Sequence, residues 1–167
     1  TKQLGFLKWF LRWATTKGYC QTLDYINFKP KLKTSEKKII FLDWPELMTV
    51  YNYPFTDKQK TLERVRDVFC FCCFTSLRYS DVANLKRSDV FDSYISLTTI
   101  KTADSIKIEL NKYSRAILDK YADQQYPGNL ALPVISNQKM NDYLKEVGKI
   151  CGIDQAVPAA GRLSATP

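Results

Sequence analysis

The spacing of hydrophobic residues changes period once, in the middle of the chain, and then changes back. From Ser93 to Ile100 the sequence is rich in β-formers, and Ile106, Ile108 and Leu110 alternate with polar residues, so this region predicts a β-hairpin. Apolar residues recur at three- and four-residue steps in four other segments, at about 4–16, 56–74, 112–123 and 136–150. The order helices, hairpin, helices predicts an α+β fold that is mainly α with a small antiparallel β-sheet.

A lysine-rich stretch divides the chain. Residues 27–38 contain five lysines, one acid and the helix-breaking Pro30, a composition typical of a linker or a solvated tether. We therefore expect a helical domain to end within 1–25, a basic linker over 26–40 and a second domain over 41–167. The chain has no initiator Met and opens inside a helical pattern, so we expect a fragment of a longer protein.

Composition narrows the classes of function. The net charge of +8 favours a polyanionic partner, either nucleic acid or an acidic membrane surface. No apolar run reaches the roughly 18 residues that a membrane span needs. The five cysteines are odd in number and loosely spaced, which indicates a reducing, cytoplasmic compartment rather than a disulfide framework.

The chain contains no histidine, which excludes an imidazole base, a Ser-His-Asp triad and an HExxH zinc motif. It also lacks a P-loop and a GxGxxG turn. Cys70 and Cys73 form a lone CxxC, which we interpret as small apolar residues in a helix core rather than as metal ligands. We expect no metal and no nucleotide cofactor.

Arg78 is the first candidate site residue, because it follows an apolar run where a helix should stop. Its guanidinium group suits two phosphate oxygens, and Asp81 could hold its plane. Ser80 is expected to cap a short helix from Asp81, whose free N–H groups would add to an anion site. Lys101, in the hairpin turn, could reach a phosphate ester oxygen. Two cations and a helix terminus predict a phosphate site; the alternative is an ordinary exposed arginine at a helix end.

The stretch Phe74–Val82, FTSLRYSDV, followed by Leu85, resembles the first conserved box of the tyrosine recombinases, the phage-integrase family. That box reads roughly T-G-[LM]-R-x-[SG]-[ED]-[LIV]-x-x-L, and Ser76 stands where glycine is commoner. Leu97–Thr102 and Ile106–Leu110 are similar to the family's hairpin with its Lys-Thr pair, with glutamate in place of a proline in the second strand.

Two further segments match in order. Ser136–Lys145, continuing to Ile153, is similar to the helix before the family's second box, and Leu7–Gly18 is similar to the last helix of the core-binding domain. Integrases of bacterial conjugative transposons are the subgroup that the chain resembles most. Type IB topoisomerases also use an arginine and a lysine in this way, but the sequence of the first box fits the integrases better.

The resemblance implies site-specific recombination of double-stranded DNA for integration of a mobile element, in the bacterial cytoplasm. A tyrosine cleaves one strand to form a 3′-phosphotyrosyl link, and the 5′-hydroxyl of another strand reverses it. Arg78 would be the first catalytic arginine, Lys101 the general acid and Asp81 the acidic support of Arg78. The linker lysines would contact the duplex backbone: Lys29, Lys31, Lys33, Lys37 and Lys38. The parent would act as a tetramer on DNA, and this fragment would be a monomer.

The chain departs from the family in its last part. The second box needs H-x-x-R, and Ala159–Arg162 followed by Ser164 could be a degenerate copy with Arg162 as the second arginine; the alternative is an unrelated tail. The nucleophile lies downstream of that box, and none of the ten tyrosines occupies the position. Tyr143 is expected to pack. We therefore expect the fragment to bind DNA without cleaving it.

Two other functions stay open. One is a non-catalytic DNA-binding protein, a decayed or regulatory integrase relative. The other is a basic helical domain with no nucleic-acid role. Trp9, Trp13 and Trp44 are expected to pack in a core or at a domain contact rather than to stack on DNA bases.

Overall fold

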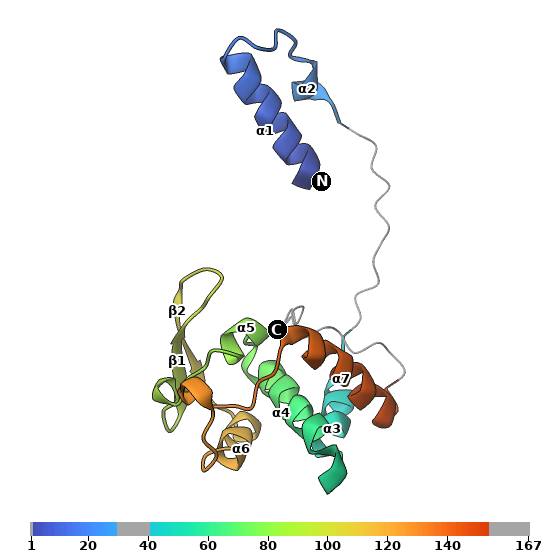
Figure 1. The fold of residues 1–167 in the computed structure, drawn as a ribbon, viewed down its shortest axis with the longest axis vertical. Helices are drawn as coiled ribbons and strands as arrows, with labels where there is room; N and C mark the ends of the chain where they lie inside the picture. The colour runs from blue at the N-terminus through green and yellow to red at the C-terminus, as the bar shows by residue number, and fades with distance from the viewer. Residues whose placement is uncertain (1, 30–40, 154–167) are drawn as a thin grey trace. The chain divides into compact units, whose positions relative to one another are not determined.

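The computed structural model describes residues 2–29 and 41–153. The chain divides into two compact units between Lys38 and Ile39, and each is described by itself. Helices α1 (Lys2–Thr16) and α2 (Asp24–Asn27) make up the described part of the first unit (Figure 1). The predicted division into 1–25, 26–40 and 41–167 stays a prediction.

Helix α1 covers the segment predicted from its periodicity. It ends where Gly18 takes a positive φ of 78° and the N–H of Tyr19 donates to the Ala14 carbonyl at 2.9 Å, a glycine-terminated helix end. Within the described residues Trp9 is 69% exposed and Trp13 is also exposed, so neither is buried in a core there, and their packing at a domain contact stays a prediction. Trp13 lies beside Phe10, with ring centroids 5.7 Å apart.

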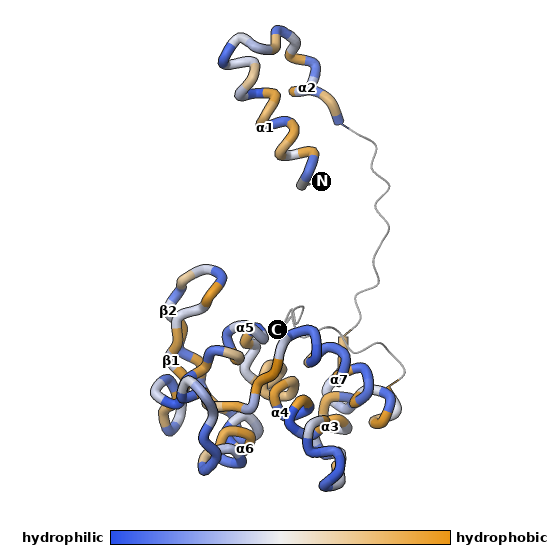
Figure 2. Tube along the Cα trace, in the orientation of Figure 1, coloured by the Kyte–Doolittle hydropathy of each residue, from blue (hydrophilic) through white to orange (hydrophobic). Residues whose placement is uncertain are grey.

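The second unit is built round helix α4 (Lys60–Thr75), which packs against α3 (Trp44–Asn52), α6 (Lys112–Lys120) and α7 (Asn137–Ile150). Figure 1 shows α4 passing between α6 on one side and α3 and α7 on the other. In Figure 2 hydrophobic residues gather along α4, whereas α7 carries long hydrophilic stretches. Helices on several sides explain why α4 is buried on more than the single face that the sequence predicted.

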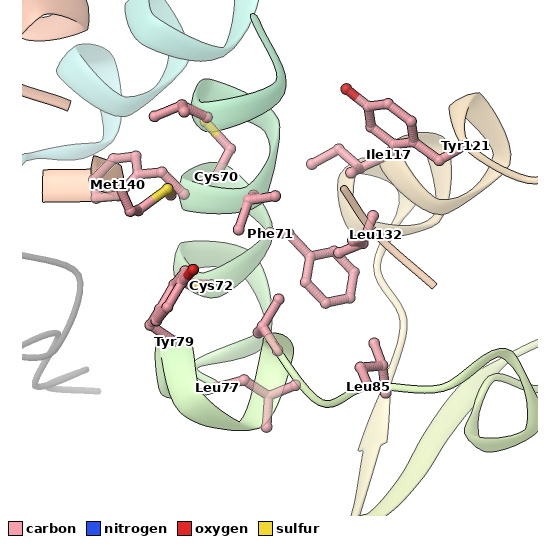
Figure 3. Packing of buried hydrophobic residues seen from close by; sticks show 14 of the residues in the cluster. Cys70, Phe71, Cys72, Leu77, Tyr79, Leu85, Ile117, Tyr121, Leu132 and Met140 are labelled. Carbon is pink, nitrogen blue, oxygen red and sulfur yellow. The ribbon is translucent and has the colours of Figure 1, made fainter. Parts of the chain in front are cut away.

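The core contains the cysteines of α4. Cys70 and Cys72 are fully buried, and Figure 3 shows Met140 on one side of α4 and Ile117 and Leu132 on the other. Burial raises the pKa of the Cys73 thiol to about 12, so this side chain stays neutral and behaves as a small apolar residue. The interpretation of Cys70 and Cys73 as residues of a helix core is confirmed for Cys70, whereas Cys73 is partly buried and packs against the core.

A buried ionic network, not anticipated from the sequence, joins α3, α4 and α6. Arg66 pairs with Asp67 (Nε to Oδ1, 2.6 Å), and its Nη1 donates to three carbonyl oxygens at the C-terminal end of α3, those of Val50, Tyr51 and Tyr53. Asp67 also accepts from Lys120 at 2.7 Å and from the Tyr121 hydroxyl at 2.6 Å. The network satisfies the orphan carbonyls that end α3.

The hairpin is confirmed. Strands β1 (Tyr94–Thr98) and β2 (Ser105–Glu109) pair antiparallel, with Leu97 opposite Ile106 and Ile95 opposite Ile108. Ile95 is fully buried, which fixes the face of the hairpin that turns toward the core. The α+β fold class predicted from the change of period is therefore correct.

The helices that follow the hairpin begin close to the predicted positions, and each begins at a polar N-cap residue. Asn111 accepts from the N–H groups of Tyr113 and Ser114 at the start of α6, and Ser136 accepts from Lys139 at the start of α7. Helix α6 ends at Lys120, earlier than the expected position near Asp123. Short 3₁₀ turns link the elements, at Asp57–Gln59, Arg87–Asp89 and Pro127–Asn129.

Candidate functional site

Arg78 lies between α4 and the short helix α5 (Tyr79–Val82), and its neighbours explain its orientation. Leu77 and Tyr79 are 3% and 7% exposed, so the chain turns alternate residues inward and Arg78 outward. Arg78 itself is exposed, and no ion pair to it exists among the described residues. Its guanidinium donors therefore face solvent, where an anionic ligand can reach them.

The start of α5 differs from the sequence-based expectation. Arg78 rather than Ser80 is the N-cap residue, and no side-chain cap bond forms; the Arg78 carbonyl accepts from Asp81 and Val82 at 2.9 and 3.1 Å. Burial of Tyr79 draws the helix start toward α4, which places Ser80 inside the helix. Because α5 has only four residues, its dipole adds little to an anion site.

Ser76 ends α4 in the left-handed region, with a φ of 58°. A residue with a Cβ is strained there, and glycine is not. This conformation gives a physical reason for the commoner glycine in the box that this stretch resembles. The turn reverses the chain directly before Arg78.

Tyr79 is a residue that sequence reasoning passed over. Its hydroxyl donates to the carbonyl of Ile135, in the segment that leads into α7. Burial raises the pKa of the Tyr79 phenol, so it stays protonated and keeps its role as donor. The bond fixes the residue next to Arg78 to a segment distant in the chain, so local sequence patterns gave no signal for it.

Lys101 is exposed in the turn between β1 and β2, as the hairpin pattern predicts. The turn is ordered by its own bonds: the Thr99 N–H donates to the Asp104 carbonyl at 2.9 Å, and the Ala103 N–H donates to the Thr99 carbonyl at 3.0 Å. The hydroxyls of Thr99 and Thr102 lie 2.8 Å apart. The backbone under Lys101 is therefore defined, while its side chain extends into solvent.

Asp81 connects the two cation-bearing elements. It is 3% exposed, and its Oδ1 accepts from the Ile100 N–H at 3.0 Å. No ion pair joins Asp81 to Arg78 within the described residues. The role of Asp81 as support of the Arg78 guanidinium stays a prediction, and its observed contact is with the turn that carries Lys101.

A polar cavity of about 210 Å³ lies behind this turn. Its lining comes from α5, the following 3₁₀ turn and the hairpin: Asp81, Asn84, Asp89, Ser96, Thr98 and Ser105, with Leu97 and Ile100. Two carboxylates in so small a space would repel a phosphate. An anion would instead meet Arg78 and Lys101 on their solvent-exposed sides.

The other predicted site residues lie in the first unit or outside the described residues. Lys29 is exposed at the end of the first unit's described part. Four further linker lysines and the candidate second catalytic arginine lie outside the described residues: Lys31, Lys33, Lys37, Lys38 and Arg162. Tyr143 is partly buried and packs against the core of the second unit.

Neither a metal-binding cluster nor a membrane-spanning helix occurs in the described part of the chain. Among residues 2–29 and 41–153, no three Cys, Asp or Glu side chains cluster so that they could hold a metal ion. Within the same ranges, no helix has the length and apolar character needed to cross a membrane.

Comparison with solved structures identifies the fold. A lambda integrase (residues 75–356) dimer bound to a COC' core site superposes with a TM-score of 0.69 at 18% identity, over 92% of this chain and 59% of that chain. XerA recombinase gives 0.57 at 19% identity, over 92% and 62%, and XerH bound to a palindromic difH substrate gives 0.59 at 15%, over 81% and 42%. The chain thus spans about half the length of these proteins.

A comparison with protein-family models finds no match, and neither does a comparison with curated proteins. The structural likeness is to tyrosine recombinases, at identities that establish the fold alone. The mainly α chain with its small antiparallel sheet has the fold of a tyrosine-recombinase catalytic domain.

Proposed function

We propose that this chain belongs to a site-specific DNA recombinase of the tyrosine type, and that Arg78 and Lys101 bind one phosphate of a DNA duplex. The observation that carries the proposal is that two exposed cations, each without an acidic partner in the described part of the chain, lie on elements joined by the Asp81–Ile100 hydrogen bond. The likeness to lambda integrase and XerH structures bound to DNA supports the choice of ligand.

In the proposed reaction a tyrosine oxygen attacks the phosphorus, and the 5′-oxygen leaves. Arg78 holds the non-bridging oxygens and stabilises the charge of the pentavalent transition state. Lys101 donates the proton that the departing 5′-oxygen takes up. This chemistry requires neither a metal nor a nucleotide cofactor, and no tyrosine of this chain is assigned as the nucleophile.

The wider proposal concerns the parent protein. It would integrate a mobile element, of the conjugative-transposon type, as a tetramer on DNA in the bacterial cytoplasm, with Lys29 and the other linker lysines on the duplex backbone. The fragment itself would be a monomer, which light scattering tests. A dimer that persists on dilution would contradict this part of the proposal.

Binding to a short duplex across a salt series tests the phosphate site. We expect wild type to bind with steep salt dependence, and Arg78→Ala and Lys101→Ala each to weaken binding and lower the log–log salt slope by about 0.9, the loss of one phosphate contact. Arg64→Ala is the matched control, because Arg64 is an exposed arginine near the other end of α4.

The outcomes separate the functions. Equal losses in all three variants would mean that net charge alone carries the affinity and would overturn the phosphate site. Binding without any phosphotyrosyl adduct, in the full parent protein with a cleavable site, would favour the non-catalytic DNA-binding alternative.

A further inference from the structure

We infer that Asp81 is a positioning residue for Lys101: its carboxylate holds the hairpin turn at a fixed place beside α5. The expected result of this positioning is that Lys101 contacts the phosphate held by Arg78, and that part of the inference rests on the proposed function. It differs from the expected role of Asp81 as a partner of the Arg78 guanidinium.

The hydrogen bonds of the turn single out this contact. Within the described residues, the bonds of Thr99–Asp104 outside the strand ladder join turn residues to one another, except the bond from Ile100 to Asp81. Ile100 and Lys101 are exposed, so packing does not hold the tip. The tip therefore takes its position from strands β1 and β2 below it and from the Asp81 carboxylate beside it.

The partner of the turn is rigid. Val82 and Leu85, which flank Asp81 on the core side, are almost fully buried, and the Tyr79 hydroxyl ties α5 to the Ile135 carbonyl. A buried carboxylate is costly unless it accepts strong hydrogen bonds, and an N–H donor to a carboxylate forms one of the stronger kinds. The bond thus transmits the position of α5, and with it that of Arg78, to the turn.

The consequence is preorganisation of two cations on different elements. Lys101 has a long, rotatable side chain, so the place of its backbone decides how far its ammonium can reach. A turn fixed before DNA binds avoids the entropic loss of ordering it in the complex. The role requires an acceptor oxygen at Asp81, whereas support of Arg78 would require its negative charge.

Amide hydrogen exchange of the whole chain tests the bond without DNA. We expect Asp81→Ala to speed exchange of the Ile100 amide by roughly tenfold, the loss of about one hydrogen bond, and Asp81→Asn, which keeps an acceptor oxygen, to change it much less. Asp89→Ala is the matched control, because Asp89 lines the same cavity but accepts from the Lys86 N–H. Unchanged Ile100 exchange in a folded Asp81→Ala variant would overturn the inference.

A double-mutant cycle of duplex binding tests whether the Asp81 hydrogen bond positions Lys101. Lys101→Ala should weaken duplex binding in wild type and have little further effect in Asp81→Ala, whereas Arg78→Ala should weaken binding in both backgrounds. Asp81→Asn should retain most of the Lys101 effect. A Lys101→Ala effect of equal size in both backgrounds, or a loss of the Lys101 effect in Asp81→Asn equal to that in Asp81→Ala, would contradict positioning by the hydrogen bond.

Failure of the proposed function gives a different result. If neither Arg78→Ala nor Lys101→Ala changes binding in wild type, the phosphate site is wrong, while Ile100 exchange still decides whether Asp81 holds the turn. If Asp81→Ala does not fold, Ile100→Pro removes the donor from the turn and leaves α5 intact. The same cycle with Lys101→Ala in that background then supports or overturns the inference.

Discussion

One arginine lies within α4 and another lies just after it, and their surroundings differ. Arg66, in the middle of α4, is 6% exposed and donates hydrogen bonds to Asp67 and to the carbonyl oxygens that end α3. Arg78, just after α4, is exposed and makes no ion pair within the described residues. A cation whose donors are satisfied by the protein stabilises the fold, and one whose donors are unsatisfied is available to a ligand.

The largest effect should come from the buried arginine. Arg66→Ala removes one of the two cations that pair with the buried Asp67, leaving Lys120, and takes the side-chain donor from the carbonyl oxygens at the end of α3. We therefore expect a loss of about 3 kcal/mol in the free energy of unfolding. Urea unfolding measures it. Arg64→Ala, an exposed arginine one position before Val65 on the same helix, should change stability by less than about 0.5 kcal/mol.

Equal effects of Arg66→Ala and Arg64→Ala would mean that burial does not distinguish these two arginines. We expect a smaller loss in Arg66→Met than in Arg66→Ala. That result would show that part of the effect comes from packing along the arginine stem rather than from charge.

The second largest effect on stability should come from Tyr79, which ties α5 to the segment before α7. Tyr79→Phe removes the hydroxyl that donates to the partly buried Ile135 carbonyl, so we expect a loss of about 1 kcal/mol in the free energy of unfolding. Thermal or urea unfolding measures it. Tyr53→Phe is the control, because the Tyr53 hydroxyl makes no hydrogen bond within the described residues and the ring remains beside Phe55, so this variant should lose less.

The sequence predicted elements whose signal is local. Alternation over Ile106–Leu110 identified the hairpin, and Ser136 with its helical spacing identified α7, because pleats and helices repeat within a few residues. The cap at Ser80 was wrong because burial of Tyr79, a tertiary effect, sets the start of α5. No local pattern singled out Arg66, since its partners at the end of α3 are distant in the chain.

In the candidate site, too, features with a local signal were predicted and those that depend on tertiary contacts were not. Arg78 and Lys101 were found from local pattern and resemblance, and the structure shows both exposed on adjoining elements. The bond from Ile100 to Asp81 could not be predicted, because it depends on how the hairpin folds back on α5. Spacing along the chain carries no information about that contact.

A smaller effect, in the stabilising direction, should come from Ser76. Its φ of 58° strains a residue with a Cβ, so Ser76→Gly should raise the free energy of unfolding by up to about 1 kcal/mol, less the entropy that glycine loses on folding. Chemical denaturation measures the change. Ser76→Ala keeps the Cβ and should give no gain; a gain of equal size would show that the strain is not the cause.

The smallest effect on stability should come from Arg78. Arg78→Ala removes an exposed side chain with no ion pair in the described structure, so the free energy of unfolding should change by less than about 0.5 kcal/mol. The same variant should show the clearest loss in salt-dependent duplex binding, and Arg66→Met, if it folds, should bind as wild type does. A destabilisation by Arg78→Ala comparable to that of Arg66→Ala would mean that Arg78 is a structural arginine after all. The contrast between the two would then disappear, because both side chains would serve the fold and neither would be left for a phosphate.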